Sequence, residues 1–494
     1  MLEKQALQII RRLLIVACAI GGTAAPAQRV FLSGTPDTFA PPTEAPSPSP
    51  GILAFINANY PGMKGVRQYD ELHANQYFGT TFTGVPSVCG AKLELQVQLG
   101  DSPLNINDGI SLAFLGASGT PVASGWDAGL GDLGLTTQTP QTLILDLEAL
   151  PSASGPVNLL PSLNHQHFLD VLIQDDTGVD YAKLTVTPCD VWMKDNLGDT
   201  GKEPSTGIVY ESPDIRVCHS LGCTGYENPI RGQTNYVYAT LRNNGPNAPV
   251  PHQASGTIEL YYTSSGGAAV WTKDWTLIGK TLVTLAPNEV RDVWIPWVPP
   301  TTGPSHVCLL ARWVSEVDPM TYTETTNTLD NTQKNNNLAW RNVNLVNAPS
   351  GLAQYLDFRV RNIDPKLTTM GGLQLRIPEP SWSFLRYGRI YITLSPALWN
   401  AWVKVAGSST GVRVVGDRQL QVINPNGAWL PNIQLAPDAA EVATLSFIYD
   451  GTQDLPPFKV EMVQFNQPNG EQPPIELGGV EYDIRASRSS SPAP

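Results

Sequence analysis

Residues 231–250 read RGQTNYVYATLRNNGPNAPV, and this stretch indicates a β-strand that ends in a marked turn. On an extended chain, Tyr236 and Tyr238 point to one face, while Val237 and Ala239 point to the other. The run then breaks at NNGP, whose residue types favour turns. A short strand with two differently composed faces is typical of an antiparallel sheet that buries one side.

The same alternation recurs along the whole chain. In AKLELQVQLG (91–100) every second residue is apolar, and RIYITL (389–394) repeats the pattern. The 494 residues include 43 glycines and 43 prolines, so we expect short elements joined by many turns. No sustained helical repeat stands out beyond the N-terminus. The sequence therefore predicts an all-β chain of tandem β-sandwich domains, with strand spacing in the first domain that suggests a sandwich or jelly roll.

Shifts in composition divide the chain into segments. We expect a signal peptide at 1–27, an extended and solvated Pro/Ser/Thr-rich linker at 28–54, a jelly-roll-like sandwich at 55–190, a polar connector at 191–204, a second sandwich at 205–347, a C-terminal sandwich at 353–485 and a disordered tail at 486–494. One short helix is expected within SPALWNAWVKVAG (395–407).

The N-terminus predicts export. Arg11 and Arg12 precede LLIVACAIGG, an apolar run too short to span a bilayer, and a small-residue cleavage site lies before Gln28. A secreted or cell-surface protein is expected, and the periplasm stays open. A lipoprotein anchored at Cys18 and a twin-arginine signal are the alternatives. No later apolar segment is long enough for a transmembrane helix.

The charge of the chain bears on its partners. The net charge is −13, and no basic cluster is present. A phosphate backbone would be repelled, so nucleic acid is not expected as a partner.

Five cysteines follow the signal peptide, and export favours disulfide bonds among them. Cys89 and Cys189 flank the first and last clear strands of the first domain, so we expect them to pair. Cys218 and Cys223 would close a tight loop. Cys308 lies in a strand-like run and is expected to be a buried free thiol, with a bond to another chain as the alternative.

A family resemblance covers 205–347. The ordered strings SPDIRV, NPIRGQTNYVYATLRNNGP, TIELYY, WIPWVPP, HVCLLARW and NNNLAWRNVNLV resemble the bacterial cell-adhesion-related (CARDB-like) immunoglobulin-fold domain. This resemblance implies a seven-strand sandwich that serves as an accessory module in exported proteins. The full expectation is a jelly-roll-like sandwich followed by two immunoglobulin-like ones.

Two acidic stretches are candidate calcium sites. DNLGDTG supplies Asp195 and Asp199, whose carboxylates are ligands of the kind calcium prefers. IQDDTGVD supplies Asp175, Asp176 and Asp180. The first domain loosely resembles jelly-roll carbohydrate-binding modules, in which an acidic stretch near the last strand often belongs to a calcium site. The alternative for both stretches is turn acids that accept backbone N–H groups.

Tryptophans are the candidate binding residues. Exposed rings could stack on sugars or anchor a protein partner, and the alternative is packing in a core. The rings concerned are Trp271, Trp275, Trp399 and Trp402.

No catalytic motif is evident: the chain lacks H-E-x-x-H and a phosphate-binding loop. We therefore expect an exported, non-catalytic binding or adhesion protein that recognises a glycan or a surface protein. One alternative is a structural subunit of an extracellular layer or filament, which would be a homo-oligomer. Another is a hydrolase with an unrecognised site.

Overall fold

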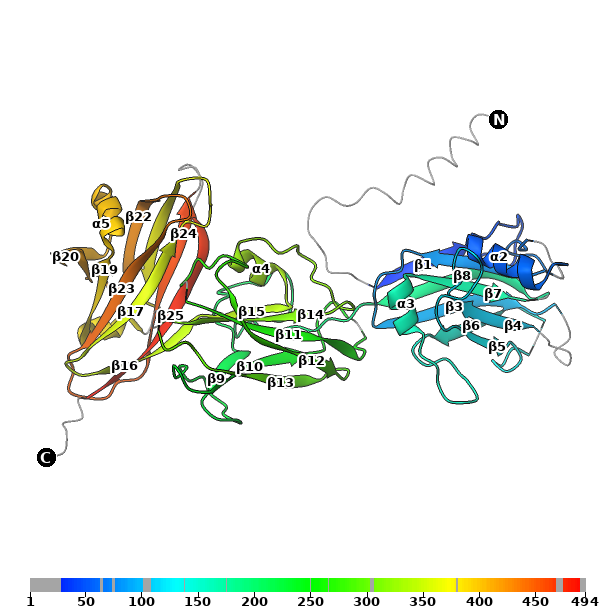
Figure 1. The fold of residues 1–494 in the computed structure, drawn as a ribbon, viewed down its shortest axis with the longest axis horizontal. Coiled ribbons are helices and arrows are strands. Elements are labelled where there is room, and N and C mark those ends of the chain that lie inside the picture. Colours follow the sequence, from blue (N-terminus) through cyan, green and yellow to red (C-terminus); the bar gives the residue numbers. More distant parts are fainter. Residues whose placement is uncertain are drawn as a thin grey trace.

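The computed structural model describes residues 28–62, 65–72, 76–100, 108–136, 138–174, 176–248, 250–264, 266–302, 306–378, 381–467 and 474–488. The signal peptide and Cys18 lie outside these residues. Strands make up 45% and helices 9% of the described residues, which confirms the predicted all-β class. Three sandwiches follow one another along the long axis (Figure 1). Among the described residues, no helix is long and apolar enough to cross a membrane.

The first sandwich has two four-stranded sheets, in the orders β1-β8-β3-β6 and β2-β7-β4-β5. Its strands are β1 (Arg29–Gly34), β2 (Phe78–Thr83), β3 (Gly90–Gln98), β4 (Gly109–Ala113), β5 (Trp126–Gly129), β6 (Gln141–Asp146), β7 (Phe168–Ile173) and β8 (Gly178–Thr187), and its helices are α2 (Pro50–Asn59) and α3 (Leu160–Gln166). The antiparallel pairs β1–β8, β2–β7, β3–β6 and β4–β5 are nested within one another. This nesting is the topology of a jelly roll, as predicted.

The alternation in β3 explains how its sheet packs. Leu93 and Leu95 are fully buried and face the opposite sheet, while Glu94 faces outward and pairs with Lys183 at 2.8 Å. The central strands β3 and β8 align Leu93 with Leu184, another core residue. Period-two burial of this kind creates the core between the two sheets.

The prediction of an extended linker at 28–54 is wrong, because this segment contains a strand and the start of a helix. Residues 29–34 form β1 and close the first sheet against β8. Further along, Ser49 caps α2 through a hydrogen bond from the Ile52 N–H to its Oγ at 3.1 Å. The helix then buries Ile52 and Ile56. Composition alone misled here, because proline and serine are also the residues that start a helix.

The polar connector expected at 191–204 is also corrected. Val191 and Met193 are fully buried and belong to the core of the middle sandwich. The Val191 N–H donates to Asp318 Oδ2 at 2.8 Å. The segment after the first domain is therefore packed structure and not a free spacer.

The middle sandwich has a three-stranded sheet, β13-β10-β9, and a four-stranded sheet, β12-β11-β14-β15. Its strands are β9 (Ile215–Cys218), β10 (Asn235–Arg242), β11 (Ala254–Thr263), β12 (Thr276–Leu285), β13 (Val290–Trp297), β14 (Cys308–Val314) and β15 (Leu338–Arg341), with helix α4 (Thr328–Lys334) beside them. These seven strands match the seven-strand sandwich that the CARDB-like resemblance implies.

The two tyrosines of the opening stretch lie on the outer face of β10. Tyr236 contacts Trp294 of β13 edge-to-face, with ring centroids 5.5 Å apart. Tyr238 accepts the Gly222 N–H at 3.0 Å and carries the Arg216 guanidinium 4.3 Å from its ring centroid. The Tyr238 side chain thus holds the Cys218–Cys223 loop onto the sheet.

The C-terminal sandwich has two five-stranded sheets, β16-β25-β24-β18-β22 and β17-β23-β19-β21-β20. Its strands are β16 (Val343–Pro349), β17 (Ala353–Arg361), β18 (Thr369–Arg376), β19 (Gly388–Leu394), β20 (Val412–Gly416), β21 (Gln419–Val422), β22 (Gly427–Leu435), β23 (Ala440–Tyr449), β24 (Phe458–Gln467) and β25 (Ile475–Ser487). The helical elements are η2 (Ser381–Arg386), α5 (Pro396–Val403) and η3 (Ala406–Ser408). Helix α5 falls where the short helix was predicted.

Two expectations for the C-terminal part differ from the structure. The ten described strands exceed the seven of an immunoglobulin-like sandwich. The expected tail at 486–494 begins inside β25, because Ala486 and Ser487 pair with Ala348 and Pro349 of β16. The remainder of the tail beyond residue 488 lies outside the described residues.

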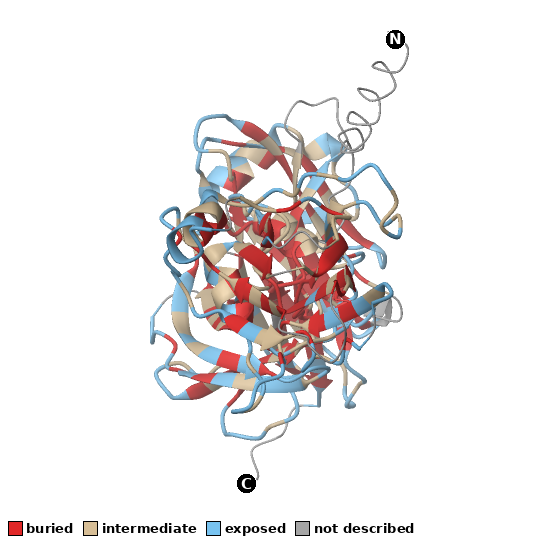
Figure 2. Ribbon diagram, turned by 90° about the vertical axis from the view of Figure 1, so that its right-hand side faces the viewer, coloured by how far each residue is buried: buried red, intermediate tan, exposed pale blue. Residues whose placement is uncertain are grey.

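Each sandwich has its own cluster of buried hydrophobic residues. In Figure 2 the buried segments lie mostly towards the middle of the ribbon, and the peripheral loops are mostly exposed. The middle and C-terminal sandwiches also meet closely. A Cβ at Gly478, which has φ +131°, would lie 2.1 Å from the Gly267 carbonyl oxygen, so glycine is required there. Arg361 bridges the same junction by pairing with Asp274 and Asp438.

Candidate functional site

Three carboxylates meet in the first sandwich. One oxygen from each of Asp37, Asp70 and Asp180 lies within 4.8 Å of the others. Asp180 is in β8 and is only 1% exposed. The other two come from the loops before α2 and β2, so three separate parts of the chain form the cluster.

The position of Asp180 explains why the first of these loops folds onto β8. Its carboxylate accepts the N–H groups of Asp37 and Thr38 at 3.3 Å and of Phe39 at 3.1 Å. Thr38 and Phe39 have φ of 65° and 62°, a left-handed conformation that these hydrogen bonds stabilise. Asp37 in turn accepts the Ala40 N–H at 2.9 Å.

Asp70 is the member of the cluster whose carboxylate has an oxygen without a hydrogen bond. Its Oδ1 is buried and has no hydrogen-bond partner among the described residues. Burial first, then repulsion by Asp37 and Asp180, raises the pKa of Asp70 to about 7. A buried orphan oxygen beside two further carboxylates fits a hard cation such as calcium, which would neutralise this repulsion.

The remaining predicted acids lie elsewhere. Asp175 is outside the described residues, and Asp176 is not part of the cluster. Asp199 accepts the N–H groups of Asp195 and Gly201, both at 2.9 Å. Asp195 accepts the Ser205 hydroxyl, and burial raises its pKa well above the ordinary value. Asp199 therefore acts as a turn acid, which was the alternative interpretation of this stretch.

A pocket of about 620 Å³ opens at one end of the first sandwich, between α2 and the β2-β7-β4-β5 sheet. Aromatic rings line one side: Tyr60 is 38% exposed, and its ring centroid lies 4.7 Å from that of Tyr77 and 6.3 Å from that of Phe55. Polar groups line the rest of the pocket, from Asp108, Ser111, Asp127, Asp132 and Gln174.

The polar side of this pocket is only partly occupied by internal hydrogen bonds. Tyr77 donates its hydroxyl to Gln174 Oε1 at 3.1 Å, which positions both side chains. Asp127, in β5, and Asp132, just after it, are exposed, and no described side chain pairs with either carboxylate. The pocket thus presents flat apolar rings beside free hydrogen-bond acceptors.

Two of the four tryptophans proposed for binding, Trp275 and Trp402, are buried. Trp275 is 7% exposed and donates its Nε1–H to Thr328 Oγ1 at 3.1 Å. Trp402 is 4% exposed and donates to Ser409 Oγ at 2.9 Å. These two rings are packed inside and cannot stack on a ligand. Trp271 and Trp399 are half-buried against Tyr261 and Trp402.

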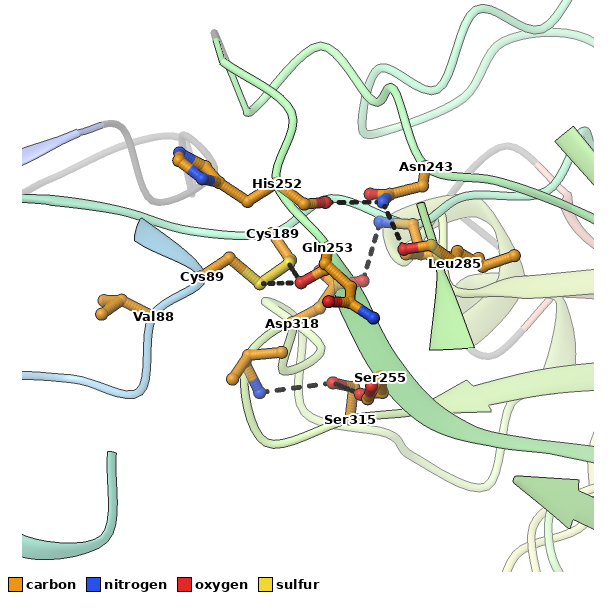
Figure 3. The surroundings of a disulfide bond; sticks show 12 residues. Val88, Cys89, Cys189, Asn243, His252, Gln253, Ser255, Leu285, Ser315 and Asp318 are labelled. Carbon is orange, nitrogen blue, oxygen red and sulfur yellow. Dashed lines mark hydrogen bonds between the residues drawn. A yellow bond between two sulfur atoms is a disulfide. The ribbon is translucent and has the colours of Figure 1, made fainter. Parts of the chain in front are cut away.

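Both predicted disulfide bonds are present, between Cys89 and Cys189 and between Cys218 and Cys223. Cys308 is a buried free thiol, as expected. Figure 3 shows the Cys89–Cys189 bond at the junction of the first two sandwiches, with both sulfur atoms near the Gln253 carbonyl oxygen. The bond packs on the middle core, and its cysteines flank two strands of the first sandwich, Cys89 before β3 and Cys189 after β8.

A groove of about 740 Å³ lies beside this disulfide. Several of its polar side chains already have partners: Glu148 pairs with His252 at 3.1 Å, and Asn164 exchanges two 2.8 Å hydrogen bonds with the Val88 backbone. Ser255 bonds to Thr284 at 2.9 Å.

No protein-family profile matches the chain, and no curated protein matches it. Solved structures match parts of it. A CARDB domain of Pyrococcus furiosus, in complex with di-metal ions, is 18% identical with a TM-score of 0.16; the match covers 28% of this chain and 93% of that domain. The collagen adhesin of S. aureus is 8% identical with a TM-score of 0.18, covering 55% and 92%. A putative β-galactosidase of Bacteroides fragilis is 9% identical with a TM-score of 0.17, covering 67% and 42%.

Adhesins and enzymes both occur among these structures, and their low TM-scores leave the function to be inferred from the chain's own residues. By fold, the chain is a disulfide-bonded protein of tandem β-sandwiches. Disulfide bonds form and persist outside the reducing cytosol, which suggests an extracellular location.

Proposed function

We propose that this chain is an exported, non-catalytic binding protein of the adhesion type. It recognises a glycan through the pocket formed by Tyr60, Tyr77 and Phe55 in the first sandwich. The observation that carries this proposal is the exposed Tyr60 ring beside the unpaired carboxylates of Asp127 and Asp132.

The chemistry of the pocket suits a sugar. The ring hydrogens of a pyranose form an apolar face that stacks on a tyrosine ring, as apolar faces do on aromatic side chains generally. Its hydroxyls donate hydrogen bonds, and Asp127 and Asp132 supply acceptors at the rim of the pocket. Because the carboxylates are acidic, a neutral or amino sugar is favoured over a sulfated or uronic one.

Calcium is part of the proposal as a structural ion. Asp37, Asp70 and Asp180 would hold it, since Asp70 provides a buried oxygen without a partner. The ion would offset the repulsion among the three carboxylates and fasten the N-terminal loop to β8. The cluster lines neither the aromatic pocket nor the groove, so its proposed role is to stabilise the sandwich.

The binding test uses the whole purified chain. A glycan array identifies a ligand, and titration calorimetry then compares the wild type with Tyr60→Ala. Loss of one stacking ring should weaken binding by about tenfold or more, given about 1.4 kcal/mol per tenfold. Tyr355→Ala is the matched control, because Tyr355 is 64% exposed in the distant C-terminal sandwich. Equal affinity of all three proteins would contradict the assignment of the pocket.

A second test separates binding from hydrolysis. The recovered glycan is analysed by mass spectrometry after incubation with the protein, and we expect it to be intact. Asp127→Asn should weaken binding without changing that result. Release of shortened products by the wild type would favour the hydrolase alternative.

Assembly into a layer or filament is the second candidate. Strand β20 is at the edge of its sheet and exposes Val414 to 56% and Val415 to 42%. Unprotected edge strands with apolar side chains pair readily with other strands. The native mass measured by sedimentation over a range of concentrations tests this: a strict monomer contradicts assembly, and Val414→Lys should dissolve any oligomer.

A further inference from the structure

Four buried polar side chains gather at the junction of the middle and C-terminal sandwiches. His306 and Cys308 are two residues apart at the start of β14, and Asn342 and Asn344 are two residues apart at the start of β16. Period-two spacing brings each pair onto one face of its strand. Their exposures are 0%, 0%, 0% and 6%.

The contacts within this cluster form a chain of three. His306 Nε2 lies 2.9 Å from Cys308 Sγ, and His306 Nδ1 lies 2.5 Å from Asn344 Nδ2. On its other side, the Cys308 thiol donates to Asn342 Oδ1 at 3.0 Å. A nucleophile, a base and an orienting side chain within hydrogen-bond reach are the arrangement of covalent catalysis. Here the nucleophile is the Cys308 thiol, and the group that it faces is the side-chain amide of Asn342.

We propose that Cys308 attacks the side-chain amide of Asn342 and forms an intramolecular thioester. The thiol proton passes to His306 Nε2, and the sulfur electron pair forms an S–Cγ bond. The Cγ–Nδ2 bond then breaks, and the nitrogen takes the proton from His306 and leaves as ammonia. No oxidant or other reactant is needed, because one thiol and one amide give one thioester and one ammonia.

The surroundings favour this step. Trp340 Nε1–H is buried beside the Cys308 thiol, so it can stabilise negative charge on the sulfur as the thiol proton leaves. Asn342 Nδ2 is held by the carbonyls of Gly479 and Gly266, which fixes the amide against the sulfur. Fixed contact of this kind replaces the entropy loss of a bimolecular encounter.

The histidine must adopt the right tautomer. With Asn344 oriented so that its Oδ1 accepts Nδ1–H, Nε2 is unprotonated and can accept the thiol proton; the opposite amide orientation gives the other tautomer. Burial raises the pKa of Cys308 and lowers the pKa of His306 to about 4. Both groups are therefore neutral at pH 7, and the proton moves during the attack rather than before it.

Burial also protects the product. Thioesters are lost to hydrolysis in water, and the four side chains are shielded from it by both sandwiches. The bond would join the start of β14 to the link between β15 and β16, where the chain enters the C-terminal sandwich. It would act as a covalent brace at this junction, independent of any glycan bound by the first sandwich.

The decisive measurement is the intact mass of the chain from Gln28 onward, without the signal peptide and its Cys18, unfolded in acid without reductant. We expect a mass lower by one ammonia than that of the chain with two disulfide bonds, and no titratable thiol. Because an N-terminal glutamine can also lose ammonia by cyclising, peptide mapping must find the peptides of Cys308 and Asn342 joined. Hydroxylamine should release them and restore the thiol. A full mass with one thiol per chain would overturn the proposal.

Variants locate the chemistry. Cys308→Ala should retain the Asn342 amide, and His306→Gln should leave both the amide and a titratable thiol. Asn344→Asp, which accepts from Nδ1–H in either orientation, should speed formation in freshly refolded protein. Unchanged ammonia loss in Cys308→Ala would contradict this site, and the wild-type result stands even where a variant fails to fold.

Discussion

The carboxylate of Asp180 accepts the backbone N–H of Phe39 at 3.1 Å, across 141 residues of sequence. This bond fastens the segment after β1 to the start of β8, the strand with which β1 pairs. The first sandwich is therefore closed by its most N-terminal described residues.

Phe31 should matter for stability although it lies in a Pro/Ser-rich region. Its ring packs against the first core from β1, whereas its neighbour Val30 is 57% exposed. Phe31→Ala should lower the free energy of unfolding of the first sandwich by about 2 kcal/mol. Val30→Ala should change it by less than about 0.5 kcal/mol. Urea denaturation compares the two, and equal effects would mean that β1 is not part of the folded unit.

The stability of the first sandwich should depend on Asp70. The pKa of this carboxyl is raised to about 7 in the folded state, above its unfolded value, so the folded state binds the extra proton. Its contribution is fully present below about pH 4 and is lost as the pH rises to about 7. Without calcium, the melting temperature of the wild type should therefore fall relative to Asp70→Asn over this range.

Calcium should offset the loss of wild-type melting temperature, relative to Asp70→Asn, that is expected as the pH rises to about 7. At a free calcium concentration of a hundred times the dissociation constant, binding would stabilise the sandwich by about 2.7 kcal/mol. We expect calcium to raise the wild-type melting temperature at pH 7 and a chelator to reverse the shift, with little effect in Asp70→Asn. Asp199→Asn is the matched control, since both its carboxylate oxygens accept backbone N–H groups. A calcium response retained in Asp70→Asn would place the ion elsewhere.

The two disulfide bonds should differ in their contribution. Cys89 and Cys189 are 100 residues apart in sequence, whereas Cys218 and Cys223 are 5 apart. From loop-closure entropy, replacing the first pair by alanine should cost about 4–5 kcal/mol and the second about 2 kcal/mol. Calorimetry, with transitions assigned by hydrogen exchange, measures both. A larger loss from the short loop would show that the Cys218–Cys223 loop stabilises its sheet mainly through contacts.

The two tryptophans of α5 should contribute unequally to stability, because Trp402 is buried and Trp399 is only half-buried. Trp402 is 4% exposed and hydrogen-bonded to Ser409, so Trp402→Ala should cost about 3–5 kcal/mol. Trp399 is half-buried beside it at 4.9 Å, and Trp399→Ala should cost no more than about 1.5 kcal/mol. Denaturant unfolding of both variants checks this; an equal loss would mean that the two rings act as one packed unit.

Much of the fold could be predicted from local pattern. Alternation in 91–100 predicted β3, and the position of Cys89 and Cys189 beside the terminal strands predicted their bond. Helix α2 was missed although its signals were present: Ser49 and Pro50 precede the apolar run ILAFI. The proline-rich composition around them outweighed those signals, because composition averages over residues that act singly.

The candidate sites could be predicted only in part. Asp180 was singled out from its place near the last strand, but Asp37 and Asp70 were not. Tyr60 and Asp127 were also missed, since nothing in their own neighbourhoods marks them as partners. The tryptophans drew attention by their type, and burial then excluded Trp275 and Trp402 as binding residues.

By itself, the sequence determined which segments extend, where they turn and which cysteines lie close enough to bond, because period-two burial and turn chemistry act between near neighbours. Only the tertiary structure decided that β1 closes the first sheet, that three distant aspartates share one site, and that His306, Cys308, Asn342 and Asn344 meet in a dry interior. These meetings depend on which strands pair and which faces pack, and those choices arise from the burial of the whole chain at once.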